Sequence, residues 1–132
     1  MMLLSIDEHD RRPIYQQIVG QVREQVRSGR LKTGDELPSV RELADGLGIN
    51  MHTVRNAYLK LRDQGIITMR LGRKARIARW KSPQDMADRQ EELEARLREL
   101  ITDAVLTGLS TDEFIELVKQ QIKQLKKEKP LT

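Results

Sequence analysis

The sequence of 132 residues contains no cysteine, which excludes disulfide bonds and metal sites built from thiolates. Histidine is almost as scarce. His9 and His52 would need carboxylate ligands to hold a zinc ion, and nothing in the sequence brings them together. With only four aromatic residues, the core has to be built from aliphatic side chains. We therefore expect no metal site and no cofactor.

Long apolar runs are absent as well. None approaches the roughly 18 residues that a membrane helix needs, and the apolar start MMLL is followed by acids, which is the wrong charge order for a signal peptide. The sequence offers no nucleophile–base constellation, and GLG at 46–48 is too short for a nucleotide-binding fingerprint. We expect a soluble, cytoplasmic, bacterial protein that has no catalytic residues and does not bind membranes.

Positive charge is concentrated in the first part of the chain. Residues 1–80 hold 15 Lys and Arg against 9 Asp and Glu, whereas residues 81–132 hold 9 against 11. The stretch RLGRKARIAR, residues 70–79, has five basic residues and no acid. This distribution indicates an anionic polymer as the partner, although a basic stretch can also be a plain solubilising surface.

Residues 13–29 have the pattern of a first helix. Pro13 suits a first helical position, and Gly29 can end the helix in a left-handed conformation. An apolar residue recurs at every fourth position, at Ile14, Ile18, Val22 and Val26. LKTGDELP, residues 31–38, then predicts a turn and a short extended segment.

Two short capped helices follow. Ser39 and Glu42 form the capping box that begins one helix, which ends at Gly48. Asn50 is placed to cap the next helix, over 50–64. Two capped helices separated by a glycine-containing turn of about three residues are typical of a helix-turn-helix.

A basic hairpin comes next. In IITMRL, residues 66–71, Ile67, Met69 and Leu71 fall on one side and Thr68 and Arg70 on the other, after which GRK forms a turn and ARIARW returns. The order helix, short strand, helix, helix, hairpin is that of a winged helix-turn-helix.

The third helix has two distinct faces. At about 100° per residue, the apolar residues Val54, Ala57, Tyr58 and Leu61 share the side that must face the other helices. The opposite side carries His52, Thr53, Asn56 and Lys60, with Arg55 at its flank. Asn, Thr and Arg are residue types that hydrogen-bond bases in the major groove, and a helix N-terminus suits phosphate.

Each of these residues also has a structural alternative. Asn50 can serve only as a cap, and His52 can be plain surface. Arg55 can form a salt bridge with Glu42 or Asp45, and Lys60 can be solvated or lie at a phosphate.

These residues resemble a known family. PSVRELADGLGINMHTVRNAYLKLRDQGIITMRLGR is similar to the DNA-binding half of GntR family transcription regulators, and the similarity spans residues 13–77. The resemblance implies operator contacts from the start of the second helix, the start of the third helix and the wing glycine, here Arg41, Asn50, Met51, His52, Thr53, Arg55 and Gly72.

Two positions depart from the family pattern. Met51 stands where Arg or Pro is common, and the wing lacks the second glycine and the threonine that usually follow Gly72. Basic residues stand there instead. We expect Arg73, Lys74 and Arg76 to contact phosphates or the minor groove.

The last fifty residues predict an antiparallel helical hairpin. Ser82 is a candidate N-cap, Gly108 separates the two helices, and Ser110 and Glu113 form a second capping box. Two helices bury one another only partly, so the remaining apolar stripe needs a second copy of the hairpin or, alternatively, the winged domain. We expect a dimer interface at Leu93, Leu97, Leu100, Ala104, Phe114, Val118 and Ile122.

The short tail resembles the YtrA-like subgroup of the GntR family, in which two C-terminal helices form a dimerisation unit. About fifty residues in two helices cannot enclose a ligand pocket of about 300 Å³ within one chain, so a small-molecule effector is not expected; a small cleft at the dimer interface is the alternative.

Together the observations predict a mostly α-helical fold with a small β-hairpin. Residues 1–79 would form a winged helix-turn-helix DNA-binding domain, and residues 80–132 a two-helix dimerisation domain. The predicted function is that of a homodimeric transcription regulator, most simply a repressor, on a palindromic double-stranded operator. The alternative is a winged-helix module that docks an acidic protein partner.

Overall fold

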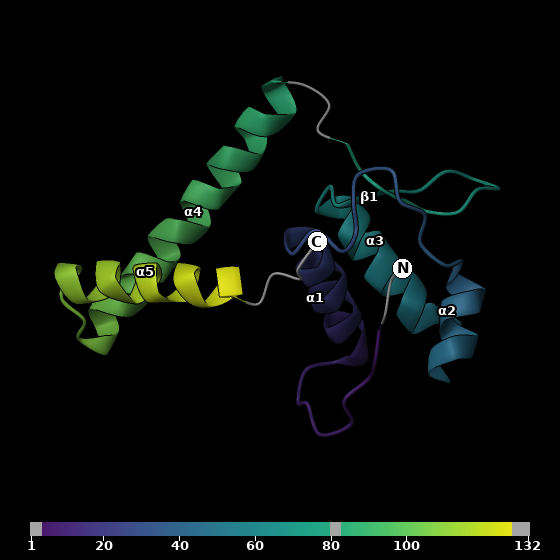
Figure 1. The fold of residues 1–132 in the computed structure, drawn as a ribbon, viewed down its shortest axis with the longest axis horizontal. Helices are drawn as coiled ribbons and strands as arrows, with labels where there is room; N and C mark the ends of the chain where they lie inside the picture. The colour runs from purple at the N-terminus through teal and green to yellow at the C-terminus, as the bar shows by residue number, and fades with distance from the viewer. Residues whose placement is uncertain (1–3, 80–82, 128–132) are drawn as a thin grey trace. The chain divides into compact units, whose positions relative to one another are not determined.

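The computed structural model describes residues 4–79 and 83–127, and these ranges contain five helices and one two-stranded sheet. Figure 1 shows helices and strands in chain order. The predicted fold class, mostly α with a small β-hairpin, is confirmed. The chain divides between residues 79 and 80 into two compact units.

The first unit begins with three helices whose ends follow the capping signals. Helix α1 (Ile14–Arg27) starts after Pro13, which occupies the N-cap position, and Gly29 beyond its end has φ +83°. Helix α2 (Val40–Leu47) starts with the predicted capping box and ends at Gly48, which has φ +67°. Helix α3 (Met51–Asp63) is capped by Asn50. At the starts of α2 and α3, side-chain oxygens accept N–H groups that have no partner within the helix, whereas α1 has no side-chain cap.

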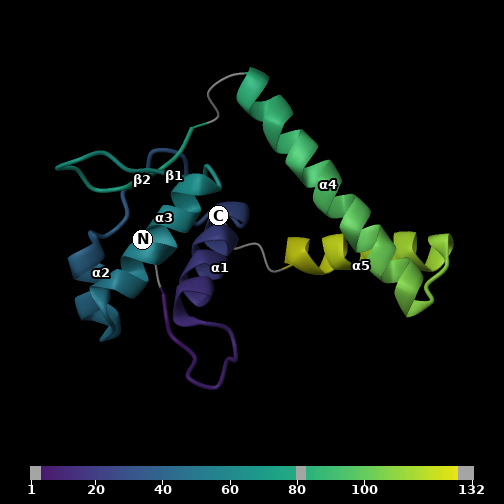
Figure 2. The ribbon, with the colours of Figure 1, turned by 180° about the vertical axis from the view of Figure 1, so that it is seen from behind.

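Helix α3 is the centre of the core of the first unit. It packs against α1 and α2, and Figures 1 and 2 show it beside both from opposite sides. The predicted inward face, Val54, Ala57, Tyr58 and Leu61, is buried.

A part-buried hydrogen bond links α3 to the chain before α2. The Tyr58 hydroxyl donates to the Pro38 carbonyl over 2.6 Å. Burial, reinforced by the negative charge of Glu42, raises the pKa of Tyr58, so its hydroxyl keeps the proton that it donates.

The wing is a hairpin held against the extended segment before α2. Strands β1 (Ile67–Thr68) and β2 (Arg76–Ile77) pair antiparallel, with Ile67 opposite Ile77 and Thr68 opposite Arg76. On its other side the returning chain pairs with residues 34–37. The Leu37 N–H donates to the Ala75 carbonyl at 2.8 Å, and the Ile77 N–H to the Asp35 carbonyl at 2.9 Å. The predicted extended segment thus pairs with the returning chain of the hairpin and anchors the wing.

The predicted pattern of the hairpin is wrong at its tip. Ile67 is buried and Met69 half-buried, but Leu71 is fully exposed and does not share their side. The strand pairing ends at Thr68, and a turn closes early, where the Arg73 N–H donates to the Arg70 carbonyl at 3.1 Å. Gly72, with φ +75°, adopts the left-handed conformation that this turn requires.

The second unit consists of α4 (Pro83–Thr107) and α5 (Thr111–Lys127). Ser110 and Glu113 form the predicted capping box of α5, whereas Ser82 lies outside the described residues. The two helices cross near the turn that joins them and then diverge rather than lying along one another (Figures 1 and 2). Of the side chains described in this unit, only that of Ala104 is buried.

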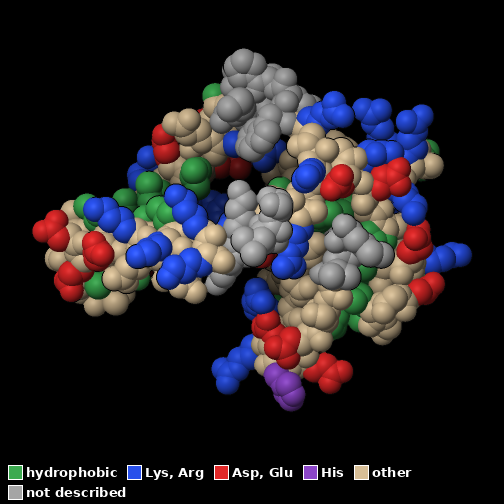
Figure 3. All heavy atoms as spheres, viewed as in Figure 1, with side chains coloured by type: hydrophobic (Ala, Val, Ile, Leu, Met, Phe, Trp, Pro, Cys, Tyr) green, Lys and Arg blue, Asp and Glu red, His purple; other side chains and the backbone are tan. Residues whose placement is uncertain are grey.

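Both helices therefore expose apolar side chains, which Figure 3 shows in green among charged ones. The larger ones on α4 and the first part of α5 are Leu93, Leu97, Leu100, Ile101, Val105, Leu106, Ile115, Leu117, Val118 and Ile122. Across residues 4–79 and 83–127, no helix combines the length and apolarity of a membrane span.

We predict that Leu61→Ala lowers the free energy of unfolding by roughly 2–5 kcal/mol, because it leaves a cavity where a fully buried side chain contacts the core. Leu71→Ala removes a fully exposed side chain and should change the free energy of unfolding by less than about 0.5 kcal/mol. Urea denaturation followed by circular dichroism measures both. Equal effects would contradict the assignment of the core.

Candidate nucleic-acid interface

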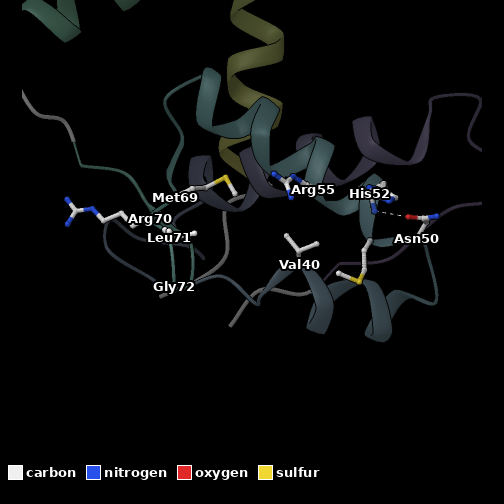
Figure 4. Close-up of a pocket in the computed structure, with 9 residues that line it drawn as sticks. Val40, Asn50, His52, Arg55, Met69, Arg70, Leu71 and Gly72 are labelled. Atoms are coloured by element: carbon white, nitrogen blue, oxygen red, sulfur yellow. Dashed lines mark hydrogen bonds between the residues drawn. The ribbon is translucent and has the colours of Figure 1, made fainter.

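A cleft of about 750 Å³ lies between the start of α3, the start of α2 and the wing. We call it the α3–wing cleft (Figure 4). It brings together five of the predicted contact residues, although the wing glycine is far from the others in sequence. Its lining consists of Val40, Asn50, Met51, His52, Arg55, Met69, Arg70, Leu71 and Gly72.

The first turn of α3 forms one wall of the cleft. The Asn50 side chain accepts the His52 N–H at 2.7 Å, so the predicted cap is confirmed. Met51 and His52 are exposed. A helix N-terminus with exposed side chains at a concave surface is an arrangement that can enter the major groove of DNA.

Arg55 stands one turn further along α3, exposed and directed toward the cleft in Figure 4. Neither alternative partner binds it, since no ion pair of Arg55 is present in residues 4–79 and 83–127. Glu42 pairs with Lys74 instead. The Arg55 guanidinium is therefore available to bind a ligand.

The other predicted residues of the helices lie outside this lining. Arg41 is exposed on the first turn of α2, while Asn56 and Lys60 are exposed on α3 and Thr53 is half-buried. Asp63, whose charge would repel phosphate, is paired with Arg62 at 3.2 Å.

The cations of the wing fall into two groups. Lys74 Nζ lies 3.2 Å from a Glu42 carboxylate oxygen, and Arg76 pairs with Glu36 while donating to the Gly34 carbonyl at 2.8 Å. These two side chains therefore hold the wing against residues 34–42 in the free chain. In the described part of the chain, Arg70 and Arg73 make no ion pair. Figure 3 shows Lys and Arg side chains, in blue, gathered over the wing.

Four residues of the cleft were not among the predicted contacts, namely Val40, Met69, Arg70 and Leu71. Alternation put Arg70 on one side of the expected strand and Leu71 on the other, yet both line the cleft, and Figure 4 shows the Arg70 side chain extending away from the wing. The signal that could have found Arg70 is its position at the start of the basic stretch 70–79.

A second hollow, of about 350 Å³, lies beside the cleft and is lined by Arg73, Lys74 and the start of α2, including Ser39 and Val40. Within the ranges that the structure describes, no three His, Asp or Glu side chains are grouped to hold a metal ion. Cationic and amide groups around an apolar lining are suited to binding an anionic polymer.

Glu42 links the cap of α2 to the wing. Its carboxylate accepts the Ser39 N–H, and its own N–H donates to the Ser39 hydroxyl at 3.1 Å. The Ser39 hydrogen bonds, and then Lys74, lower the pKa of Glu42 below its ordinary value of 4.5. The ionised carboxylate is thus the form that both contacts stabilise.

The sequence has close relatives among known proteins. Residues 14–77 match the family described as bacterial regulatory proteins, gntR family. The HTH-type transcriptional repressor YtrA of Bacillus subtilis (strain 168) is 35% identical over 118 residues, which cover 89% of this chain and 91% of that protein. The uncharacterized HTH-type transcriptional regulator YhcF of the same strain is 33% identical and covers 82% and 88%.

Solved structures show the same similarity. A transcriptional antiterminator from Listeria monocytogenes EGD-e has a TM-score of 0.73 at 32% identity, covering 94% of this chain and 92% of that one. YtrA from Sulfolobus acidocaldarius, a GntR-family transcription factor, has a TM-score of 0.64 at 34% identity, covering 92% and 97%. These similarities extend over the helices of the second unit as well as the wing.

We predict that Glu42→Gln reduces the acid sensitivity of the first unit. A lowered carboxyl pKa contributes stability that is present above about pH 4.5 and is lost as the pH falls below it. Glutamine can still serve the capping box but does not titrate. Ser39→Ala is the comparison, because it should cost about 1 kcal/mol at neutral pH through loss of the cap. Urea denaturation at pH 7 and pH 4 distinguishes the two variants. If the free energy of unfolding of Glu42→Gln depends on pH as that of the wild type does, the stabilising role of the ionised Glu42 carboxylate would be refuted.

Proposed function

The chain belongs to the GntR family of bacterial regulatory proteins, and on that premise we propose that it is a DNA-binding transcription regulator that recognises a palindromic operator as a homodimer. The observation that carries the proposal is the α3–wing cleft. It places the exposed start of α3 and the cationic wing around one concave surface.

In this proposal the first two turns of α3 enter the major groove. His52, Arg55 and Asn56 are the base contacts, since all three are exposed and have donors or acceptors that match base edges. Met51 offers an apolar contact to a thymine methyl group. Arg41, Asn50, Thr53 and Lys60 would lie at the phosphate edge of the contact.

The wing supplies the second part of the contact. Gly72 permits close approach of the backbone, and Arg73 meets the minor groove or its phosphates. Lys74 and Arg76 would exchange their carboxylates for phosphates, and the exchange costs little because exposed ion pairs contribute only about 0–1 kcal/mol.

We further propose that α4 and α5 form the dimer. In the described residues of the second unit only Ala104 is buried, while Leu93, Leu97 and Leu100 remain exposed on α4. A second copy of the two helices would cover this face and that of Phe114, Val118 and Ile122. A two-fold dimer also matches two operator half-sites, one or more helical turns apart.

Repression is the mode of action that we propose, because the relative from Bacillus subtilis is named a repressor. A dimer seated on an operator would exclude polymerase from the promoter. The proposed site of action is the cytoplasm, where bacterial DNA is accessible.

We predict that Arg55→Ala weakens binding to an operator selected from random duplexes by about 1–3 kcal/mol and relaxes the preference for one base pair. Arg62→Ala is the matched control on the same helix. Arg62 is paired with Asp63, and its loss should have little effect on sequence preference. Fluorescence anisotropy over a salt series measures affinity, which should fall steeply with salt as counterions are released.

Equal binding to the selected operator and to a scrambled duplex would contradict the proposed role as a sequence-specific regulator. If the chain binds an acidic protein and does not bind DNA, the alternative function, a winged-helix protein-interaction module, would be supported.

We also predict that Leu97→Glu dissociates the dimer, because it places a charge within the proposed apolar interface. Arg98→Glu introduces the same side chain at the neighbouring position, on a different side of α4, and should leave the dimer intact. Light scattering at micromolar concentration measures the mass. A wild-type chain that is monomeric with and without operator would contradict the proposed interface.

A further inference from the structure

The most exposed large apolar side chain of the first unit is that of Leu71, at the tip of the wing. Its relative exposure is 104%, as great as in an isolated residue, whereas Met51, on the opposite wall of the cleft, is 44% exposed. Single exposed apolar residues are common on proteins and need no explanation by themselves. The position of Leu71 is what sets it apart.

Leu71 occupies the apex of a β-turn. The turn is closed by the Arg73 N–H and the Arg70 carbonyl, which places Leu71 and Gly72 at its two central positions. The φ of +75° at Gly72 is the value for the third residue of a type II turn. At such an apex the Leu71 side chain has no neighbouring strand to pack against, and it is the outermost apolar group of the wing.

Charge surrounds this apolar group. Arg70 and Arg73 flank it at the two ends of the turn, and within the described residues neither forms an ion pair. The minor groove of B-DNA is about 6 Å wide and is bordered by a phosphate strand on each side. A narrow turn with an arginine at each end and one apolar side chain at its apex is complementary to such a groove. An α-helix is too wide to enter it.

We propose that Leu71 contacts the floor of the minor groove and makes the base pairs beneath the wing specific for A·T. This inference rests on the proposed function. A G·C pair places the N2 amino group of guanine on the groove floor, where a leucine side chain would bury it without an acceptor. An A·T pair has no such group, and narrow A·T grooves also attract arginine.

The experiment uses the full chain and the operator that it selects from a random pool. Each A·T pair flanking a half-site is replaced in turn by G·C and by inosine·C, which lacks the guanine amino group. At the pairs beneath the wing, the wild-type chain should bind the G·C duplex on the order of tenfold more weakly. Inosine·C should restore binding.

Leu71→Ala should weaken binding to the A·T operator on the order of tenfold at every salt concentration, because the lost contact is apolar. It should also bind the G·C and inosine·C duplexes equally. Leu71→Met, which keeps an apolar side chain, should retain both affinity and discrimination.

Arg73→Gln is the matched control at the same turn. Its loss of affinity should be greatest at low salt, with the slope of log K against log salt reduced by about 0.9, and it should still discriminate against G·C. The two variants therefore separate an apolar contact from a phosphate contact.

Several outcomes would overturn the inference while leaving the proposed function intact. They are unchanged binding by Leu71→Ala, continued discrimination against G·C by that variant, and G·C pairs selected beneath the wing. A change in the mass of Leu71→Ala by light scattering would instead assign the side chain to a protein contact. If the wild-type chain binds selected and scrambled duplexes alike, both the inference and the proposed function fail.

Discussion

The backbone pairing between the returning strand of the wing and residues 34–37 determines the shape of the α3–wing cleft. Hydrogen bonds from Leu37 to Ala75 and from Ile77 to Asp35 attach the wing to the segment that leads into α2. The same segment is attached to α3, because the Tyr58 hydroxyl binds the Pro38 carbonyl. Wing and helix are thus positioned by one short stretch of chain, and neither can move without breaking hydrogen bonds in or near the core.

Charge on the wing is used in two ways. Glu36 and Glu42 neutralise Arg76 and Lys74 and brace the hairpin, whereas Arg70 and Arg73 at the tip make no ion pair in the described ranges. The free chain therefore keeps its wing in place without neutralising the tip. Because these ion pairs are exposed and contribute little net stability, Lys74 and Arg76 can exchange their carboxylate partners for phosphates.

The two units differ in how their apolar residues are accommodated. The first has a core centred on α3, with Val54, Ala57 and Leu61 wholly buried. In the second, α4 and α5 diverge from the turn that joins them (Figure 2), and Ala104 is the one described side chain that is buried. A first unit with its own apolar core and a second with its apolar face exposed are consistent with the separate roles in DNA binding and dimer formation that we propose.

The sequence predicts, from local patterns alone, the helices, the capping boxes at Ser39 and Ser110, and the inward face of α3. These features depend on residues within about four positions of one another, where spacing alone defines the geometry. It also indicated most of the cleft residues on α3, because that face follows once the buried face is known.

The tertiary structure was needed to show that Arg55 makes no ion pair within the described residues, which carboxylates Lys74 and Arg76 pair with, and that Leu71 is exposed. Glu42 and Lys74 are distant in sequence, and they meet only because β2 pairs with the segment before α2. Simple alternation placed Leu71 on the same side as Ile67 and Met69, but pairing ends at Thr68 and the turn closes at Arg70. Where a strand ends depends on the surface available to pair with it, and the strand's own residues do not specify that surface.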